Sequence, residues 1–203
     1  MKVCECFLLQ EDHEQNGGDR VLESDIVAHC APTLAGIKTA NMFNYLPDDI
    51  GSLHLEVEEE NRKLNEKGVY VEILRTGEKR ALIYVYRKNK LEADLSREGA
   101  EKILQTCGYE CRDTDCCLRK LQDRFFQYEC FPHEVGLFLG YPLDDVAGFI
   151  EQEGKNYKCC GIWKVYGDEQ KTRMTFQKLK KCSEIYRKLF ADGRSILQLT
   201  VAA

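Results

Sequence analysis

Five stretches of the chain carry apolar residues every three or four positions, the spacing that places them on one face of an α-helix. Residues able to cap a helix N-terminus, Asp48, Ser96 and Asp168, precede three of these stretches. Glycines follow four of them, at positions where helices commonly end. We therefore predict helices over residues 48–67, 96–107, 113–128, 142–153 and 168–192.

Two β-rich runs, at residues 69–76 and 80–87, follow the first predicted helix. They are separated by Gly77-Glu78-Lys79, which is typical of an antiparallel hairpin. Further strands are predicted over residues 157–166 and 195–201. Because helices dominate and the alternation of strands and helices is irregular, we predict an α+β fold. It would be a helix-rich single domain around a small mixed or antiparallel sheet of about four to five strands.

The organisation along the chain is simple, with no internal repeat and no linker rich in Pro, Gly and Ser. A length of 203 residues suffices for one substantial core. We predict an N-terminal arm or edge strand over residues 1–19 and a single α+β domain over residues 20–203.

Charge and hydropathy narrow the class of protein. With 29 Lys and Arg against 34 Asp and Glu, the net charge is −5, so no nucleic-acid partner is expected. No apolar run approaches the ~20 residues that span a bilayer, and the N-terminus is too polar for a secretory signal. We therefore expect a cytoplasmic protein that does not bind a membrane.

The chain is rich in cysteine, with eleven in total. In a small secreted protein such a number would indicate a disulfide framework. Here the number is odd and an export signal is absent, so we predict reduced thiols.

Four stretches together resemble the bacterial domain-of-unknown-function 3793 family: residues 29–38, 131–142, 157–168 and 195–199. The third contains Gly161-Ile162-Trp163-Lys164-Val165-Tyr166-Gly167. The likeness covers roughly residues 20–201. It implies one cytosolic domain and no particular reaction or cofactor, so no catalytic residue is transferred from it.

Cys30 is the candidate nucleophile. A thiol becomes nucleophilic when a nearby cation or imidazole stabilises its thiolate. We therefore propose a Cys–His site in which His133 is the base, Glu134 orients it and Lys38 lowers the pKa of the thiol. The structural alternative makes Cys30 a small buried apolar residue and His133 a helix cap.

A ligand pocket is the broader hypothesis. Polar residues, glycines and prolines concentrate in residues 29–38 and 131–142 without an obvious role in folding. We predict a small-molecule or cofactor pocket between these two segments. Its candidate ligand-binding residues are His29, Thr33, Lys38 and Lys164.

Two further classes stay open. A metal- or redox-responsive binding protein would use Cys111, Cys116, Cys130 and His133, although the chain has no Cys-x-x-Cys pair, the spacing typical of zinc sites. A non-catalytic interaction module would use its surface. The basic residues of the last predicted helix, Lys171, Arg173, Lys178, Lys180, Lys181, Arg187 and Lys188, are interpreted as a solvated face.

Overall fold

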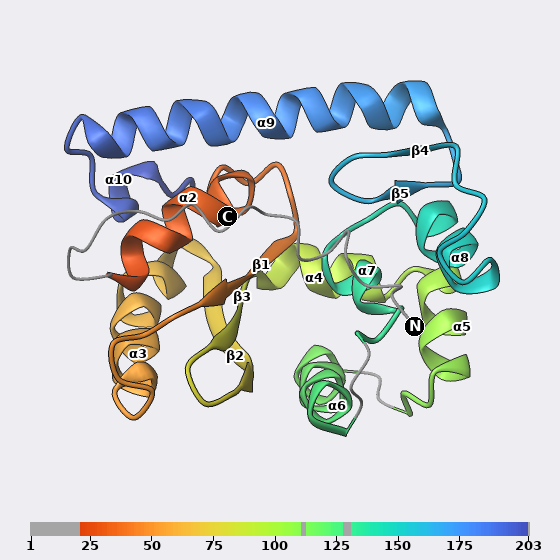
Figure 1. The fold of residues 1–203 in the computed structure, drawn as a ribbon, viewed down its shortest axis with the longest axis horizontal. Coiled ribbons are helices and arrows are strands. Elements are labelled where there is room, and N and C mark those ends of the chain that lie inside the picture. The colour runs from red at the N-terminus through yellow and green to blue at the C-terminus, as the bar shows by residue number, and fades with distance from the viewer. Residues whose placement is uncertain (1–20, 111–112, 128–130, 203) are drawn as a thin grey trace. The chain divides into compact units, whose positions relative to one another are not determined.

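A computed structural model describes residues 21–110, 113–127 and 131–202 (Figure 1). Their contacts divide them into two compact units. We call residues 90–178 the helical unit, and residues 21–89 with 179–202 the sheet unit. The predicted arm at residues 1–19 lies outside the described residues.

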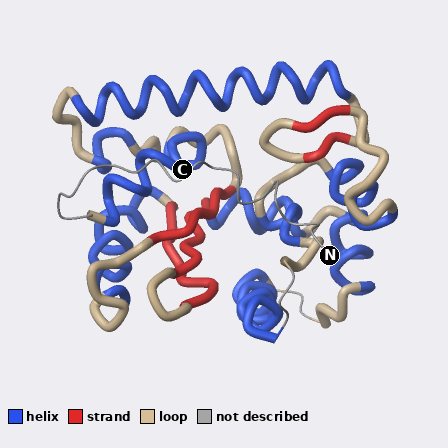
Figure 2. Tube along the Cα trace, in the orientation of Figure 1, coloured by secondary structure: helices blue, strands red, loops and turns tan. Residues whose placement is uncertain are grey.

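The sheet unit is built on three antiparallel strands, β1 (Ala40–Tyr45), β2 (Val69–Thr76) and β3 (Ala81–Arg87), in the order β1-β3-β2 (Figure 2). β3 is central and buried along its whole length. Phe43 pairs with Ile83 and Val71 pairs with Val85, so apolar side chains of all three strands share one face. That face is the floor of the core.

Four helical segments contribute to this core: α2 (Leu22–Leu34), α3 (Leu53–Leu64), α10 (Ile196–Leu199) and the C-terminal part of α9 (Glu169–Ala191). A short 3₁₀ turn, η1 (Asn65–Lys67), extends α3 and ends at Gly68. The left-handed φ of +73° at Gly68 suits glycine, because it has no Cβ to clash there.

A buried arginine, Arg87, ties three parts of the sheet unit together. It is 2% exposed and donates to the carbonyls of Thr33 (2.6 Å) and Leu34 (2.7 Å) at the end of α2. Its guanidinium also donates to the Val201 carbonyl at 2.7 Å. The cation therefore satisfies helix C-terminal carbonyls, where positive charge is favoured, and fixes the C-terminal segment against α2.

The helical unit contains five helices and a small hairpin in its described part. The helices are α4 (Lys88–Leu95), which begins in the sheet unit, α5 (Glu98–Thr106), α6 (Thr114–Gln127), α7 (Val135–Phe138) and α8 (Leu143–Glu151). The hairpin pairs β4 (Cys159–Cys160) with β5 (Lys164–Val165), and the first part of α9 follows. Glycines permit close packing: a Cβ at Gly136 would lie 2.8 Å from Val146 Cγ2, and one at Gly148 would lie 2.5 Å from Tyr166 Cγ.

The predicted fold class is confirmed, since the chain is helix-rich α+β with small antiparallel sheets. All five predicted helices and the hairpin at residues 69–87 are present. The strand predicted over residues 157–166 is wrong as a single element. Gly161 N–H donates to the Trp163 carbonyl at 3.1 Å, and this turn divides the segment into β4 and β5.

The strand predicted over residues 195–201 is also wrong, because residues 196–199 form α10. Ser195 and Gln198 make a capping box there: Gln198 N–H donates to Ser195 Oγ, and Ser195 N–H donates to Gln198 Oε1. These reciprocal bonds stabilise a helix start. α2, α4 and β1 were not among the predicted elements.

We expect Arg87→Met to lower the free energy of unfolding by about 3 kcal/mol, because several charged hydrogen bonds to buried carbonyls are lost together. Urea unfolding followed by circular dichroism measures this change. The matched control is Arg80→Met, which removes an exposed arginine from the hairpin turn and should change stability by less than about 0.5 kcal/mol. Equal effects of the two substitutions would contradict the role given to Arg87.

Candidate functional site

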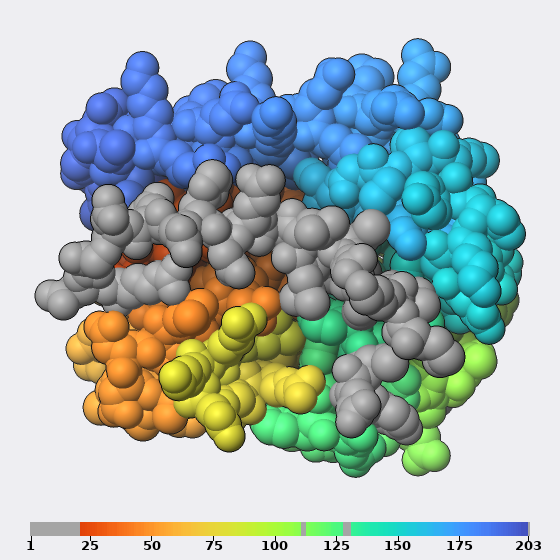
Figure 3. All heavy atoms as spheres, viewed as in Figure 1, coloured from red at the N-terminus to blue at the C-terminus, as the bar shows by residue number. Residues whose placement is uncertain are grey.

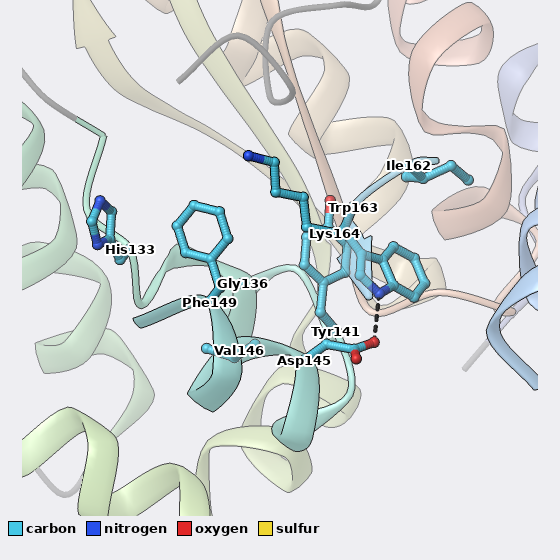
Figure 4. A pocket seen from close by; sticks show the side chains of 9 residues that line it. All are labelled: His133, Gly136, Tyr141, Asp145, Val146, Phe149, Ile162, Trp163 and Lys164. Atoms are coloured by element: carbon cyan, nitrogen blue, oxygen red, sulfur yellow. Dashed lines mark hydrogen bonds between the residues drawn. The ribbon is translucent and has the colours of Figure 1, made fainter. Parts of the chain in front are cut away.

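The helical unit contains a small pocket that is partly open to solvent (Figure 4). The segment leading into α7, α8 itself and the β4–β5 turn each contribute side chains to it. The lining residues are His133, Gly136, Tyr141, Asp145, Val146, Phe149, Ile162, Trp163 and Lys164. All lie within residues 90–178, so one compact unit forms the whole pocket.

Asp145 fixes one side of this pocket. Its side chain is 2% exposed. Oδ2 accepts a hydrogen bond from Trp163 Nε1 at 2.8 Å, the dashed line in Figure 4, and Oδ1 accepts the backbone N–H groups of Tyr166 and Gly167 at 2.7 Å each. Three donors on one buried carboxylate compensate for its lost hydration. They also bind the N-terminal turn of α8 to the β5 segment.

Aromatic rings form much of the wall. Trp163 stacks on Tyr141 with ring centroids 4.4 Å apart and meets the edge of Phe176 at 4.6 Å. Phe149 meets His133 edge to face at 5.2 Å. Burial raises the pKa of the Tyr141 hydroxyl well above its ordinary value, so this group stays protonated. Rings held on two sides give the wall a fixed shape.

Lys164 brings a positive charge to the pocket. Its Nζ donates to the Gly154 carbonyl at 2.8 Å and lies 5.8 Å from the Phe149 ring centroid and 4.9 Å from that of Tyr157. Within the described parts of the chain, no carboxylate forms an ion pair with Lys164. The ammonium is thus held by neutral partners and keeps an uncompensated charge.

His133 and Glu134, predicted to act together, have different surroundings. His133 lines the pocket, whereas Glu134 is 1% exposed and binds Arg124 Nε at 2.5 Å and the Tyr109 hydroxyl at 3.0 Å through Oε1. Burial and, to a lesser extent, the Glu134 carboxylate raise the pKa of the Tyr109 hydroxyl. Arg124 also donates to the Cys107 carbonyl at 3.0 Å, so Glu134 belongs to a network that joins α5, α6 and the start of α7.

Cys30 lies in the core of the sheet unit and is 0% exposed. Burial raises the pKa of its thiol far above the ordinary value, and the nearby charge of Lys38 only partly opposes this effect. A nucleophilic thiol needs the opposite shift and access to substrate. Since Cys30 and His133 belong to different units, their pairing stays a prediction.

Lys38, Thr33 and His29 also lie in the sheet unit, outside the pocket. Lys38 is 7% exposed and its Nζ donates to the Ala40 carbonyl. Burial lowers the pKa of this ammonium to about 7. The Thr33 hydroxyl donates to Asn41 Oδ1 at 2.8 Å, and His29 stacks on Phe43 at 5.0 Å. These contacts give the three residues roles in packing.

The residues proposed as metal ligands are only partly described. Cys111 and Cys130 lie outside the described residues, and Cys116 is disulfide-bonded, so the prediction of reduced thiols is wrong for Cys116. A cysteine in a disulfide has no thiolate to give to a metal. In the described residues, no group of three or more His, Cys, Asp or Glu side chains is placed to hold a metal ion.

Of the residues predicted from the sequence, His133 and Lys164 line this pocket, whereas Asp145 and Trp163 were not predicted as site residues. Asp145 lies in a predicted helix and Trp163 in a predicted strand, and neither position marks a site in the sequence. The bond between them spans 18 positions of the chain, and neither residue type signals it alone. Two features of the sequence could have pointed to these residues: the pair of acids that follows Pro142, and the single tryptophan in a short segment bounded by glycines.

We expect the buried Lys38 to make stability rise with pH between about 7 and 9. The folded chain releases the Lys38 proton near pH 7, whereas an unfolded lysine holds it to about 10.5. The unfolded state then binds more protons, so the free energy of unfolding rises by about 1.4 kcal/mol per pH unit. Near pH 9 the rise levels off, because the buried Cys30 thiol keeps a proton that the unfolded thiol releases.

Urea unfolding of the wild type and Lys38→Met across this range measures the effect. The free energy of unfolding of the wild type minus that of Lys38→Met should increase as the pH rises from 6.5 to 9. Parallel curves would contradict the assignment.

Comparison with known proteins identifies the family. A profile described as "Protein of unknown function (DUF3793)" matches residues 26–200. No curated protein and no solved structure matches the chain. Among the described helices, none is long and apolar enough to cross a membrane. Since the match covers most of its length, the chain belongs to the DUF3793 family.

Proposed function

We propose that this protein binds a small molecule in the pocket beside Trp163. The observation that carries the proposal is the fixed aromatic and apolar wall with a few polar groups at its edge. Ligand sites in proteins combine these two features: a mostly apolar lining and a small number of placed polar groups.

The support given by Asp145 makes this pocket suited to binding. Its three hydrogen bonds hold Trp163 and the β5 segment in one arrangement. A ligand entering such a pocket does not have to order these side chains, and this lowers the entropic cost of binding. His133 and Lys164 then provide polar contacts at two places on the lining.

A catalytic role for Cys30 is not part of the proposal. Its thiol is buried and held protonated, and Cys30 is not among the residues that line the pocket. Catalysis by the pocket itself would need a nucleophile or base whose acceptor atoms are available. Asp145, the only carboxylate among the lining residues, already accepts three hydrogen bonds, and the proposal assigns the remaining polar groups, His133 and Lys164, to binding.

The basic residues of α9 support an interaction module less strongly than the pocket supports small-molecule binding. All seven basic residues named above for this helix are exposed, and Figure 3 shows side chains of α9 projecting into solvent, which is the ordinary arrangement of a solvated helix face. Arg173 forms an i,i+4 ion pair with Glu169 at 2.7 Å. Such exposed pairs contribute little to stability and need no partner protein.

Trp163 is the only tryptophan in the chain, so its fluorescence reports directly on the pocket. We expect saturable changes in this fluorescence on titration with at least one of three phenyl probes: benzoate, benzamide and benzylamine. Ile162→Tyr adds bulk to a lining residue and should weaken binding at least about tenfold, a loss of about 1.4 kcal/mol.

The control is Leu55→Tyr, which makes the same change at a residue that is 63% exposed in the sheet unit and leaves the pocket untouched. It should bind the probes as the wild type does. The proposal fails if none of the three probes changes the fluorescence, or if Ile162→Tyr binds them unchanged.

A further inference from the structure

We infer that the ligand of this pocket is a flat aromatic acid whose acidic group is held by the Lys164 ammonium. The inference rests on the proposed function and names the chemical class of the ligand. It comes from the way charges are compensated in the pocket and from the position of the Lys164 side chain.

The two charged side chains of the lining are not equivalent. Asp145 is buried and its carboxylate is compensated by three N–H donors. Lys164 is half-buried and forms no ion pair with any carboxylate that the structure describes. The uncompensated charge at the pocket is therefore positive, and a ligand with a negative group restores the balance.

The ammonium of Lys164 is placed in advance of binding. The Gly154 carbonyl accepts one of its three donors, and the rings of Phe149 and Tyr157 lie 5.8 and 4.9 Å from Nζ. Contacts with aromatic rings favour a cation in this position. One accepted hydrogen bond leaves two donors for a ligand oxygen, which suits a carboxylate.

Phe149 links the charged end of the pocket to its apolar wall. Figure 4 shows its ring between His133 and the Lys164 side chain. The ring, with Val146 and Ile162, offers apolar surface against which a flat hydrocarbon group can pack. His133 is held edge to face on the same ring and adds a second nitrogen donor or acceptor nearby.

Ligands of other charge fit less well. A cationic ligand would meet the positive charge of Lys164, and the carboxylate that could attract it is buried and already bonded. A neutral ligand would use the aromatic wall but leave the ammonium charge uncompensated. The pocket should therefore rank acid over amide over amine when the aromatic part is the same.

The test compares benzoate, benzamide and benzylamine by Trp163 fluorescence. In the wild type we expect benzoate to bind about tenfold more tightly than benzamide, the effect of a hydrogen bond between charged groups. Lys164→Met keeps an unbranched side chain of nearly the same length and removes the charge. It should bring the ratio of the two dissociation constants to about one, chiefly by weakening benzoate, while benzamide still binds.

Two variants complete the design. Lys164→Arg keeps the charge and should keep the preference for benzoate. Lys155→Met removes a positive charge from an exposed lysine that pairs with Glu153 outside the pocket, and should also keep the preference. Retained benzamide binding shows in each variant that the pocket is folded.

Each outcome decides a different claim. If benzamide or benzylamine binds as tightly as benzoate, and Ile162→Tyr still blocks binding, the inference is overturned and the proposed function stands. If Lys164→Met retains the preference for benzoate, Lys164 does not hold the acid and the inference is overturned. If none of the probes binds, the proposed function fails, and the inference fails with it.

Discussion

The pocket depends on one buried carboxylate. Asp145 lies at the start of α8, yet its oxygens are occupied by the Trp163 indole and by two backbone N–H groups beyond β5. A buried carboxylate is tolerated only when hydrogen-bond donors replace the water it has lost. The three donors must therefore stay in place around Asp145. The tryptophan, the turn that carries it and the first turn of the helix consequently form one arrangement. Tyr141 and Phe176 complete it by contacting the indole ring from different directions.

Burial explains why Cys30 and Lys38 do not form a reactive pair in the sheet unit. Cys30 and Lys38 are a thiol and an amine, both common in catalysis, but each lies in the core of the sheet unit. Desolvation favours the neutral form of both groups, raising the pKa of one and lowering that of the other. Lys164, by contrast, is half-buried and lines the pocket of the helical unit. The difference lies in the surroundings of these residues, which residue type alone does not reveal.

Periodicity predicted five helices and the hairpin, and it failed on α2, α4 and α10. The stripes of α3, α6 and α9 extend over several turns, and the hairpin at residues 69–87 carries its own turn signal, so local pattern determined them. α10 is four residues long, and its signal was the capping box at Ser195 and Gln198 instead of a stripe. α2 contains Pro32 and buries most of its C-terminal half, so it lacks a clear polar face. The pocket residues show a similar division. Lys164 and His133 could be proposed from their residue types, whereas Asp145 acquires its role through a hydrogen bond to a residue distant in the sequence.

The central claim is that a small acid occupies the pocket beside Trp163. The indole N–H of this residue gives the only tryptophan side-chain signal in a proton–nitrogen correlation spectrum of the labelled protein. Because that N–H is bonded to Asp145 at the pocket wall, its signal should move saturably as benzoate is added, and should stay in place when Ile162→Tyr is titrated over the same range. A signal that does not move in the wild type, while signals from residues outside the pocket do, would contradict the account.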